Sequence, residues 1–471
     1  MNETYLNIFR KICQIPHGSG NREAISQFCL DFAKERGLTA WRDAACNVVI
    51  VKEATPGREK DGGVMLQGHL DMVAVKEPDL SFDFSVEPLR LRTQGDYLYA
   101  EGTSLGGDDG IAVAMALAVL DAENLSHPRL ECVFTTDEEI GMVGASQLDT
   151  SSLTSQYLLN MDSEEEGHLI ISCAGGAHGE ISFPGAWQEK REPGLRLELS
   201  GLTGGHSGTE IHKGRGNALC LLAEVLKELP GTWGLADFQG GVADNAIPSL
   251  ATAVLSVRSP EGMEAFLRQK GRQLAEAWKA ADPHLSLSWQ WQPEAARPVL
   301  EKAKEEALLS LILSLPNGPL RFDTRLQDMV LLSSNLGILR RDGDGFSLAV
   351  APRSARDEER EEVKATIRQV AEHYGASVTF SGEYPGWPLR AHSRLQQLAA
   401  QVYREQTGKE LILEGIHAGL ECGIFCQKMP QLDIIAFGPD ILDIHSTKER
   451  LSLSSAERIW SFLTEMLRRI S

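Results

Sequence analysis

The stretch MLQGHLDMVAV, residues 65–75, decides the fold of this chain. Its first part is short and apolar and runs into Gly68, a pattern that predicts a buried strand ending at a glycine. His69 and Asp71 follow, and side chains two residues apart in extended backbone point to the same side. We therefore expect an imidazole and a carboxylate together at the carboxyl end of a strand, where open α/β sheets place their sites. Taken alone, a G-x-H-x-D string fits a loop polar pair equally well.

The same arrangement of an apolar strand followed by acidic residues occurs twice more. LECVFTT at 130–136 runs directly into Glu138 and Glu139 after Asp137, and YLLNM at 157–161 runs into Asp162. Intervening helical stretches predict a largely parallel sheet with helices on both faces. The carboxyl ends of its strands would then gather these carboxylates at one edge.

A glycine-rich loop adds two more acids. GTSLGGDDG at 102–110 is followed at once by IAVAMALAVLDA, which is apolar all round and therefore predicts a buried helix. Asp108 and Asp109 would lie at its N-terminus. In isolation both fit helix N-caps.

The pattern of predicted strands and helices changes near residue 177, and the first pattern returns near residue 390. Between these points the segments predict two α+β units of the ferredoxin-like kind, each an antiparallel sheet with helices on one face. The expected architecture is an α/β catalytic domain formed by residues 1–176 and 391–471, with residues 177–390 inserted as a lid. Within it we expect one strand over 329–341, a helix over 417–428, and a last helix that begins with a capping box at Ser454–Glu457.

Composition narrows the class of function. The 471 residues carry a formal net charge of −20, which disfavours binding to nucleic acid. Eight cysteines without a paired pattern predict buried thiols in a reducing compartment, and no signal peptide or apolar run of membrane-spanning length is expected. A cytoplasmic protein without nucleic-acid or membrane partners is the expectation.

Acidic and imidazole side chains end the strands or begin the glycine loop. These residues are His69, Asp71, Asp108, Glu138, Glu139, Asp162 and His445. Carboxylates gathered at one edge repel one another by about 1–4 kcal/mol per pair, so a cation must offset them. Imidazole and carboxylate without thiolate suit zinc, manganese or cobalt, and more than four candidate ligands predict two ions. The sequence lacks an HExxH motif, a G-x-S-x-G elbow, a P-loop and a dinucleotide-binding loop.

The motif series resembles that of peptidase family M20. It comprises MLQGHLDMV, GTSLGGDDGIAVA, FTTDEEIGMVGA, LLNMDSEEEG, GLTGGHSGTEIH and the late His445-Ser446, in the family's order across nearly the whole chain. HAGLECG at 417–423, DNAIP at 244–248 and the large insertion resemble the aminoacyl-histidine (Xaa-His or β-Ala-His) dipeptidase branch in particular. In one departure, threonine follows Ser446 where the family tends to have proline, which leaves the local loop shape open.

The resemblance implies a role for each residue. Asp108 would bridge two divalent ions, zinc by expectation; Glu139 and His445 would complete one site, and His69 and Asp162 the other. Asp71 would orient the His69 ring, and Glu138 would be the general base, taking a proton from the attacking water and returning it to the leaving amine.

The resemblance also implies substrate-binding residues in the inserted domain. His206 in GGHSG would stabilise the oxyanion, and Asn245 would contact substrate, as would Arg353 or the Gly419–Glu421 loop, which lies outside the insertion. Two of these residues also fit purely structural roles: a lone histidine such as His206 is usually structural, and Asn245 fits a turn. His417 is expected to serve in helix-terminal packing.

The expected activity is hydrolysis of unblocked dipeptides, with a preference for C-terminal histidine. Two alternatives stay open: another M20-type amide hydrolase (an aminoacylase, a tripeptidase or a β-alanyl-dipeptide-specific enzyme), and a catalytically silent binding protein on the same scaffold. The two α+β units could mimic an internal dimer or pair with a second copy of the chain, so a homodimer is a further expectation.

Overall fold

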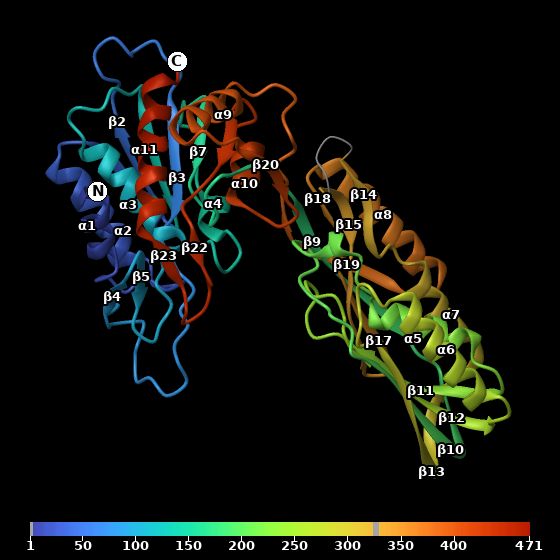
Figure 1. Ribbon diagram of the computed structural model, residues 1–471. Helices are drawn as coiled ribbons and strands as arrows, with labels where there is room; N and C mark the ends of the chain where they lie inside the picture. The colour runs from blue at the N-terminus through green and yellow to red at the C-terminus, as the bar shows by residue number, and fades with distance from the viewer. Residues whose placement is uncertain (1–2, 324–328) are drawn as a thin grey trace. The chain divides into compact units, whose positions relative to one another are not determined.

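The computed structural model describes residues 3–323 and 329–471 (Figure 1). By internal contacts the chain divides into two compact units. The first unit comprises Met1–Cys173, Leu389–Gly415 and Leu420–Ser471, and the inserted unit comprises Ala174–Pro388 and Ile416–Gly419. The four residues Ile416–Gly419 thus belong to the inserted unit although they lie in the C-terminal part of the sequence.

The first unit is built on an eight-stranded mixed sheet with the order β1-β2-β6-β3-β7-β21-β8-β20. Its strands are β1 (Thr39–Arg42), β2 (Val48–Lys52), β3 (Val64–His69), β6 (Leu130–Thr135), β7 (Tyr157–Asn160), β8 (His168–Cys173), β20 (Ile412–Ile416) and β21 (Asp433–Ala436). The four strands β6, β3, β7 and β21 pair in parallel, and β2 and β8 flank them in antiparallel pairing. The predicted α/β class with a central parallel sheet is confirmed.

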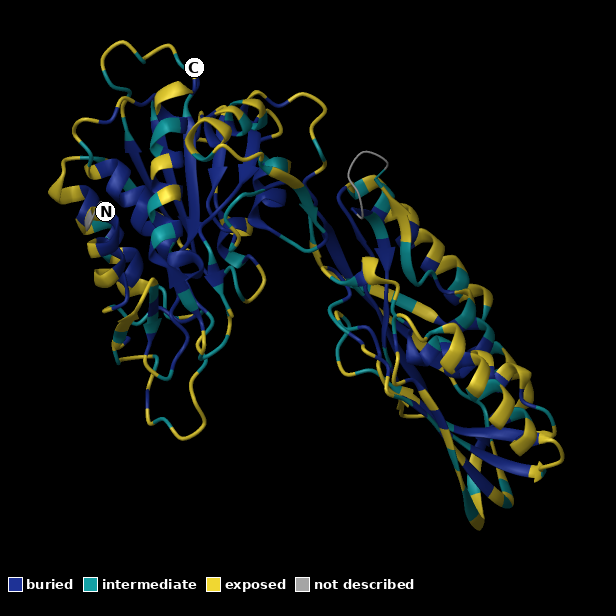
Figure 2. Ribbon diagram, in the orientation of Figure 1, coloured by how far each residue is buried: buried dark blue, intermediate teal, exposed yellow. Residues whose placement is uncertain are grey.

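The centre of this sheet is buried on both faces. Every residue of β3, β6 and β7 is buried, and these strands are dark blue throughout in Figure 2. Such strands read as continuous apolar runs because a parallel sheet is covered from both sides. The carboxyl ends of β3, β6 and β7 therefore meet at one edge, with His69 paired across from Thr135 and Gln67 from Asn160.

Helices and a small sheet complete the first unit. The helices are α1 (Glu3–Ile12), α2 (Glu23–Glu35), α3 (Gly107–Asp121), α4 (Val143–Gln147), α9 (Arg394–Thr407), α10 (Glu421–Lys428) and α11 (Leu453–Arg469). The small sheet has the order β22-β23-β5-β4 and contains β4 (Leu91–Gln94), β5 (Tyr97–Ala100), β22 (Ile441–Leu442) and β23 (Arg450–Ser452). Helix α3 is buried along almost its whole length, as its apolar sequence predicts.

The inserted unit contains two β-α-β-β-α-β arrangements in one continuous sheet. The first comprises β10 (Trp187–Ser200), α5 (Ala218–Glu228), β11 (Thr232–Gly240), β12 (Ala251–Ser259), α6 (Met263–Ala277) and β13 (Ser286–Leu300). The second comprises β9 (Gly175–Pro184), α7 (Lys302–Ser314), β16 (Leu336–Asp342), β17 (Gly345–Val350), α8 (Asp357–His373) and β19 (Ser377–Tyr384). This organisation is consistent with the predicted pair of ferredoxin-like units.

The two arrangements join where β11 pairs with β16. The sheet also contains β14 (Gly318–Phe322), β15 (Val330–Ser334) and β18 (Arg353–Ser354), and a short 3₁₀ helix η1 (Ile211–Lys213) follows β10. Helices α5 to α8 lie along one face of this sheet (Figure 1). Apolar side chains of both arrangements share one core between that face and the helices.

Three local predictions are wrong. Residues 329–341 form two strands, β15 and β16, because the chain changes sheet neighbours at Asn335. Helix α10 begins at Glu421, since the preceding residues bend into the inserted unit instead of forming its first turn. The N-cap of α11 is Ser452, whose hydroxyl accepts from the Ser455 amide, so the predicted capping box is misplaced by two residues.

In the part of the chain that the structure describes, no helix combines the length and the apolar character that crossing a membrane would require.

Candidate metal centre and substrate-binding residues

His69 lies at the end of β3 with its ring fixed by a backbone acceptor. Its Nδ1 lies 2.9 Å from the carbonyl oxygen of Asp71, so Nδ1–H donates to that carbonyl. The Asp71 carboxylate is farther away, at 3.6 Å from Nδ1. Nε2 is thereby directed away from Asp71, and loss of its proton would leave the tautomer that a metal ligand requires. Orientation of the ring by Asp71 thus comes mainly from its backbone.

Asp108 lies between two imidazoles. Its Oδ1 is 3.1 Å from His69 Nε2, and its Oδ2 is 3.2 Å from His445 Nε2. His445 Nε2 also lies 3.0 Å from Glu139 Oε1. Hydrogen bonds to both histidines hold the pKa of the buried Asp108 carboxyl well below its usual range although burial acts in the opposite direction. One carboxylate therefore offers a different oxygen to each of two groups of donor atoms.

The loop that carries Asp108 is held by a carboxylate from the far end of the chain. Glu449 accepts hydrogen bonds from the amides of Leu105 and Gly107, both at 2.8 Å, and of Gly106 at 3.2 Å. The N-cap of α3 is Gly106, whose φ of +66° lies in the left-handed region that glycine adopts without strain. Asp108 and Asp109 have non-helical φ and ψ angles, and the Asp108 oxygens face two histidines. The sequence carries no local signal for Glu449, because its partners lie more than 300 residues away.

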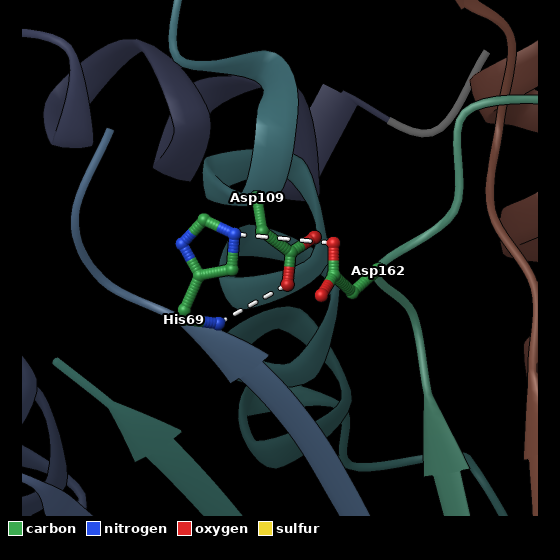
Figure 3. A group of neighbouring side chains, drawn as sticks. All are labelled: His69, Asp109 and Asp162. Atoms are coloured by element: carbon green, nitrogen blue, oxygen red, sulfur yellow. Dashed lines mark hydrogen bonds and ion pairs between the residues drawn. The ribbon is translucent and has the colours of Figure 1, made fainter. Parts of the chain in front are cut away.

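Asp109 and Asp162 complete a second group around His69 (Figure 3). Asp109 Oδ2 accepts from the His69 backbone amide at 3.1 Å, and Asp162 Oδ1 lies 3.9 Å from His69 Nε2. The peptide bond between Asp108 and Asp109 is cis. Burial raises the pKa of both Asp109 and Asp162, and neighbouring carboxylates raise it further. The sequence predicts Asp109 at the start of the buried helix but does not predict it as a ligand.

Asp71 also fixes the turn that follows β6. Its carboxylate accepts from the backbone amides of Glu138 at 3.0 Å and Glu139 at 3.3 Å, and from the Ser19 hydroxyl at 2.8 Å. The turn begins at Asp137, whose φ is +53°. One side chain thus holds in place the backbone of two adjacent glutamates.

The two glutamates lie in different surroundings. Glu139 contacts His445, whereas the carboxyl of Glu138 lies among His69, Glu421 and Glu139. Burial raises the pKa of Glu138 to about 8, with repulsion from Glu421, Glu139 and Asp108 acting in the same direction. A carboxyl that titrates near neutral pH suits proton transfer.

Glu164 is a further acid at this edge that the sequence did not single out. The run Ser163–Glu166 reads as solvated, yet Ser163 is buried and Glu164 is half-buried. A Glu164 oxygen lies within 4.8 Å of oxygens of Asp108 and Asp162, and burial raises the pKa of Glu164 to about 7. Its tertiary surroundings, which local polarity does not report, distinguish it from exposed Glu165.

The donor set of the first unit fits divalent cations. Four overlapping groups, each with ligand atoms within 4.8 Å, are His69–Asp109–Asp162, His69–Glu138–Glu139, Asp108–Glu139–His445 and Asp108–Asp162–Glu164. Nitrogen and carboxylate oxygen without a thiolate suit zinc, manganese or cobalt. The five predicted ligands His69, Asp108, Glu139, Asp162 and His445 all belong to this cluster, and the sharing of Asp108 between groups suits two ions instead of one.

The predicted substrate residues lie in the inserted unit. His206 Nδ1 accepts from the amides of Gly208 at 3.2 Å and Thr209 at 3.1 Å, so the neutral ring carries its proton on Nε2. The turn with Asn245 lies beside it, since the Ser207 amide donates to the Asn245 carbonyl at 2.7 Å. Burial, with the charge of Arg353, lowers the pKa of His206 and keeps its ring neutral.

Arg353 and His417 form the second part of this group. Arg353 is buried and donates from Nη1 to the Tyr384 hydroxyl at 2.6 Å, while its Nε has no hydrogen-bond partner among the described residues. His417 is buried and pairs through Nε2 with the Ser333 hydroxyl at 2.7 Å. His417 was expected at a helix end, but it lies four residues before α10 and packs within the inserted unit.

Comparison with known proteins places the chain in a family. Residues 65–469 match the model of Peptidase family M20/M25/M40. The chain belongs to this family. Its M20 membership confirms the resemblance drawn from the motifs and supports the prediction of a hydrolase that acts on peptide bonds.

Relatives of this M20 chain include two proteins that it matches over nearly its full length. It is 35% identical to the cytosol non-specific dipeptidase of Escherichia coli, over 98% of this chain and 97% of that protein. It is 34% identical to the aminoacylhistidine dipeptidase of Vibrio alginolyticus, whose crystal structure it matches with a TM-score of 0.93 over 100% of this chain and 97% of the other. A more distant likeness, to the aminopeptidase PepT of Bacillus cereus at 15% identity and a TM-score of 0.57 over 99% and 98% of the two chains, concerns the fold alone.

Proposed function

We propose that this protein is a di-metal dipeptidase that hydrolyses unblocked dipeptides, Xaa-His dipeptides among them. The observation that carries the proposal is the position of Asp108, whose two oxygens face His69 and His445 at 3.1 and 3.2 Å. A carboxylate shared in this way suits a bridging ligand between two ions. The names of the two full-length relatives, a non-specific dipeptidase and an aminoacylhistidine dipeptidase, support the substrate class.

Two divalent ions, zinc in this proposal, would be held by His69, Asp108, Glu139, Asp162 and His445. When bound, they would supply Lewis acidity and a nucleophilic water at neutral pH. Hydrogen bonds to Asp108 and Glu139 raise the pKa of His445 to about 10 in the chain alone. Protons and metal ions thus compete for the same nitrogen, and metal affinity should fall in acid.

Glu138 is the proposed general base. Its carboxyl takes a proton from the attacking water and returns it to the leaving amine. The backbone of this residue is held by Asp71, and its carboxyl, unlike that of Glu139, does not contact His445. Two adjacent glutamates can therefore serve different roles.

The inserted unit supplies the proposed contacts to substrate. His206 is neutral with its proton on Nε2, which is the form that donates a hydrogen bond to a developing oxyanion. Arg353 has a buried, unpartnered Nε, and a carboxylate is the natural acceptor for a guanidinium. We assign the C-terminal carboxylate of the dipeptide to Arg353 and place Asn245 beside it as a weaker contact.

The proposal includes a cytoplasmic location. Among the described residues the eight cysteines form no disulfide, which agrees with a reducing compartment. The predicted homodimer and the absence of nucleic-acid and membrane partners stay predictions.

The test is hydrolysis of a peptide panel after dialysis against a chelator, with zinc, manganese and cobalt restored in turn. The panel holds free dipeptides with and without a C-terminal histidine, a β-alanyl dipeptide, their N-acetyl derivatives and a tripeptide. We expect the chelated protein to be inactive and the restored protein to cleave free dipeptides only. Cleavage of N-acyl amino acids or tripeptides instead would reassign the chain within its family, and metal binding without any hydrolysis would make it a binding protein.

A further inference from the structure

A buried polar network lies directly beneath the candidate metal centre. Gln67 of β3 donates from Nε2 to Glu421 Oε2 at 2.5 Å, and Thr135 of β6 donates from its hydroxyl to the same oxygen at 2.6 Å. Asn160 of β7 donates from Nδ2 to Gln67 Oε1 at 2.6 Å. All four side chains are 0% exposed. The network therefore ties three parallel strands to the first residue of helix α10.

Each strand residue of the network lies just before residues of the site. Gln67 precedes His69 by two positions, Thr135 precedes the Glu138-Glu139 turn, and Asn160 precedes Asp162 by two. Backbone pairing already aligns the strands, with His69 opposite Thr135 and Gln67 opposite Asn160. Pairing alone leaves the strand ends free to twist, whereas side-chain bonds across three strands fix their relative position. Small displacements there would move ligands from all three strands.

Glu421 is the acceptor on which this network converges. A buried carboxylate that accepts two hydrogen bonds contributes more than a neutral acceptor, and its removal leaves two buried donors without their partner. Its other oxygen, Oε1, has no hydrogen-bond partner within the described ranges. Retaining a carboxyl group here is costly for stability alone, since an apolar side chain would pack without that penalty.

We propose that Glu421 is a positioning residue of the metal centre: through Gln67 and Thr135 it fixes the ends of β3, β6 and β7 so that His69, the glutamate turn and Asp162 meet one pair of ions. This inference rests on the proposed di-metal function. Its hydrogen bonds run to the strand residues Gln67 and Thr135, and its charge also acts on the carboxyl of Glu138, so metal affinity is the readout that reports positioning.

The first experiment titrates metal-free protein with Co²⁺ and follows its visible absorption bands, a readout that does not depend on turnover. Glu421→Leu should bind Co²⁺ about 10–100-fold more weakly than the unaltered chain, as expected when an outer hydrogen-bond partner of a metal site is lost. It should show a reduced kcat with little change in KM. Glu421→Gln should recover most of both properties, because its amide oxygen can accept the same two bonds.

The matched control is Glu131→Leu. Glu131 is also 0% exposed and lies on the same strand, β6, but at its opposite end, where it accepts from Thr154 and Ser155. Its loss should lower the melting temperature without altering Co²⁺ affinity or the Co²⁺ spectrum. The control separates loss of a buried carboxylate from loss of the network.

The outcomes distinguish this inference from the proposed function. If the unaltered chain binds no Co²⁺ and cleaves no dipeptide, the proposed function fails. If it does both and Glu421→Leu matches Glu131→Leu in Co²⁺ affinity, only the positioning role is overturned. Should Glu421→Leu not fold by circular dichroism, Gln67→Leu replaces it in the same titration, with the same expected weakening and the same contradicting result.

Discussion

The two units of the chain carry functional side chains of opposite electrostatic character. The first unit gathers carboxylates around His69 and His445, so its cluster attracts cations. The inserted unit gathers His206, Arg353 and His417, where burial and the charge of Arg353 keep both histidines neutral. Under the proposed function, the first unit would hold the ions that activate water, and the inserted unit would supply donors for the carbonyl and carboxylate of a dipeptide. The proposal thus assigns chemistry and substrate recognition to separate structural units.

The largest expected effect comes from the first unit. Glu138→Gln removes the proposed base while leaving the metal ligands in place, so kcat should fall by about 10³-fold. Metal content, measured by atomic emission after gel filtration, should stay near two ions per chain. The exposed neighbour Glu165 provides the control, since Glu165→Gln should leave kcat unchanged. Wild-type turnover in Glu138→Gln would remove the base assignment.

The next effect tests the inserted unit as a source of oxyanion stabilisation. His206→Ala removes the Nε2–H donor, and kcat should fall by about 10²-fold with metal content unchanged. The exposed His212 lies nearby on η1, and His212→Asn should behave like the unaltered chain. A fall in metal content in His206→Ala, in place of a fall in kcat, would contradict the division between the two units.

A smaller effect concerns the carboxylate of the substrate. Arg353→Met keeps much of the packing volume but removes the charge, so KM for free dipeptides should rise by about 10-fold with little change in kcat. With a dipeptide amide, which lacks the carboxylate, the unaltered chain and Arg353→Met should have similar KM values. Arg360→Met is the control, because Arg360 is also buried but already pairs with Asp357 at 2.8 Å. Equal increases in KM for both variants would show that Arg353 acts only through packing.

The smallest effect is a dependence of stability on pH in the inserted unit. Burial, with the charge of Arg353, lowers the pKa of His417 to about 3. The folded state therefore excludes a proton that the unfolded chain takes up below about pH 6.5, and the stabilisation from His417 is complete above that pH and is lost as pH falls toward 3. The deficit in melting temperature of His417→Leu should thus shrink from pH 8 to pH 5, by about 2 °C per pH unit below 6.5. Parallel melting curves across that range would show that His417 does not contribute to the pH dependence.

Sequence patterns predicted the central sheet because each buried strand is a short apolar run. An acidic residue follows the last residue of each of β3, β6 and β7 by two positions, at Asp71, Asp137 and Asp162. The convergence of His69, Glu139 and Asp162 followed from the rule that parallel strands place their carboxyl ends at one edge, whereas Asp108 and His445 joined the set through the family resemblance. Local boundaries were less predictable, as the cap of α11 at Ser452 shows, since several serines in a row compete for the same role.

The sequence did not predict which distant residues form hydrogen bonds to the site. Glu449 holds the amides before Asp108, and Glu421 joins Gln67 and Thr135, yet each lies in an ordinary helical or loop context. Glu164 looks identical to its exposed neighbour Glu165 in composition, and only its burial separates them.

The sequence by itself determined the strand-and-acid pattern, the candidate ligand residues and the family, because apolar periodicity and residue chemistry can be recognised locally. The tertiary structure decided which carboxylate faces both His69 and His445, and which buried acid joins the strand residues beneath the site. Those properties depend on distances between residues hundreds of positions apart, and only packing sets them.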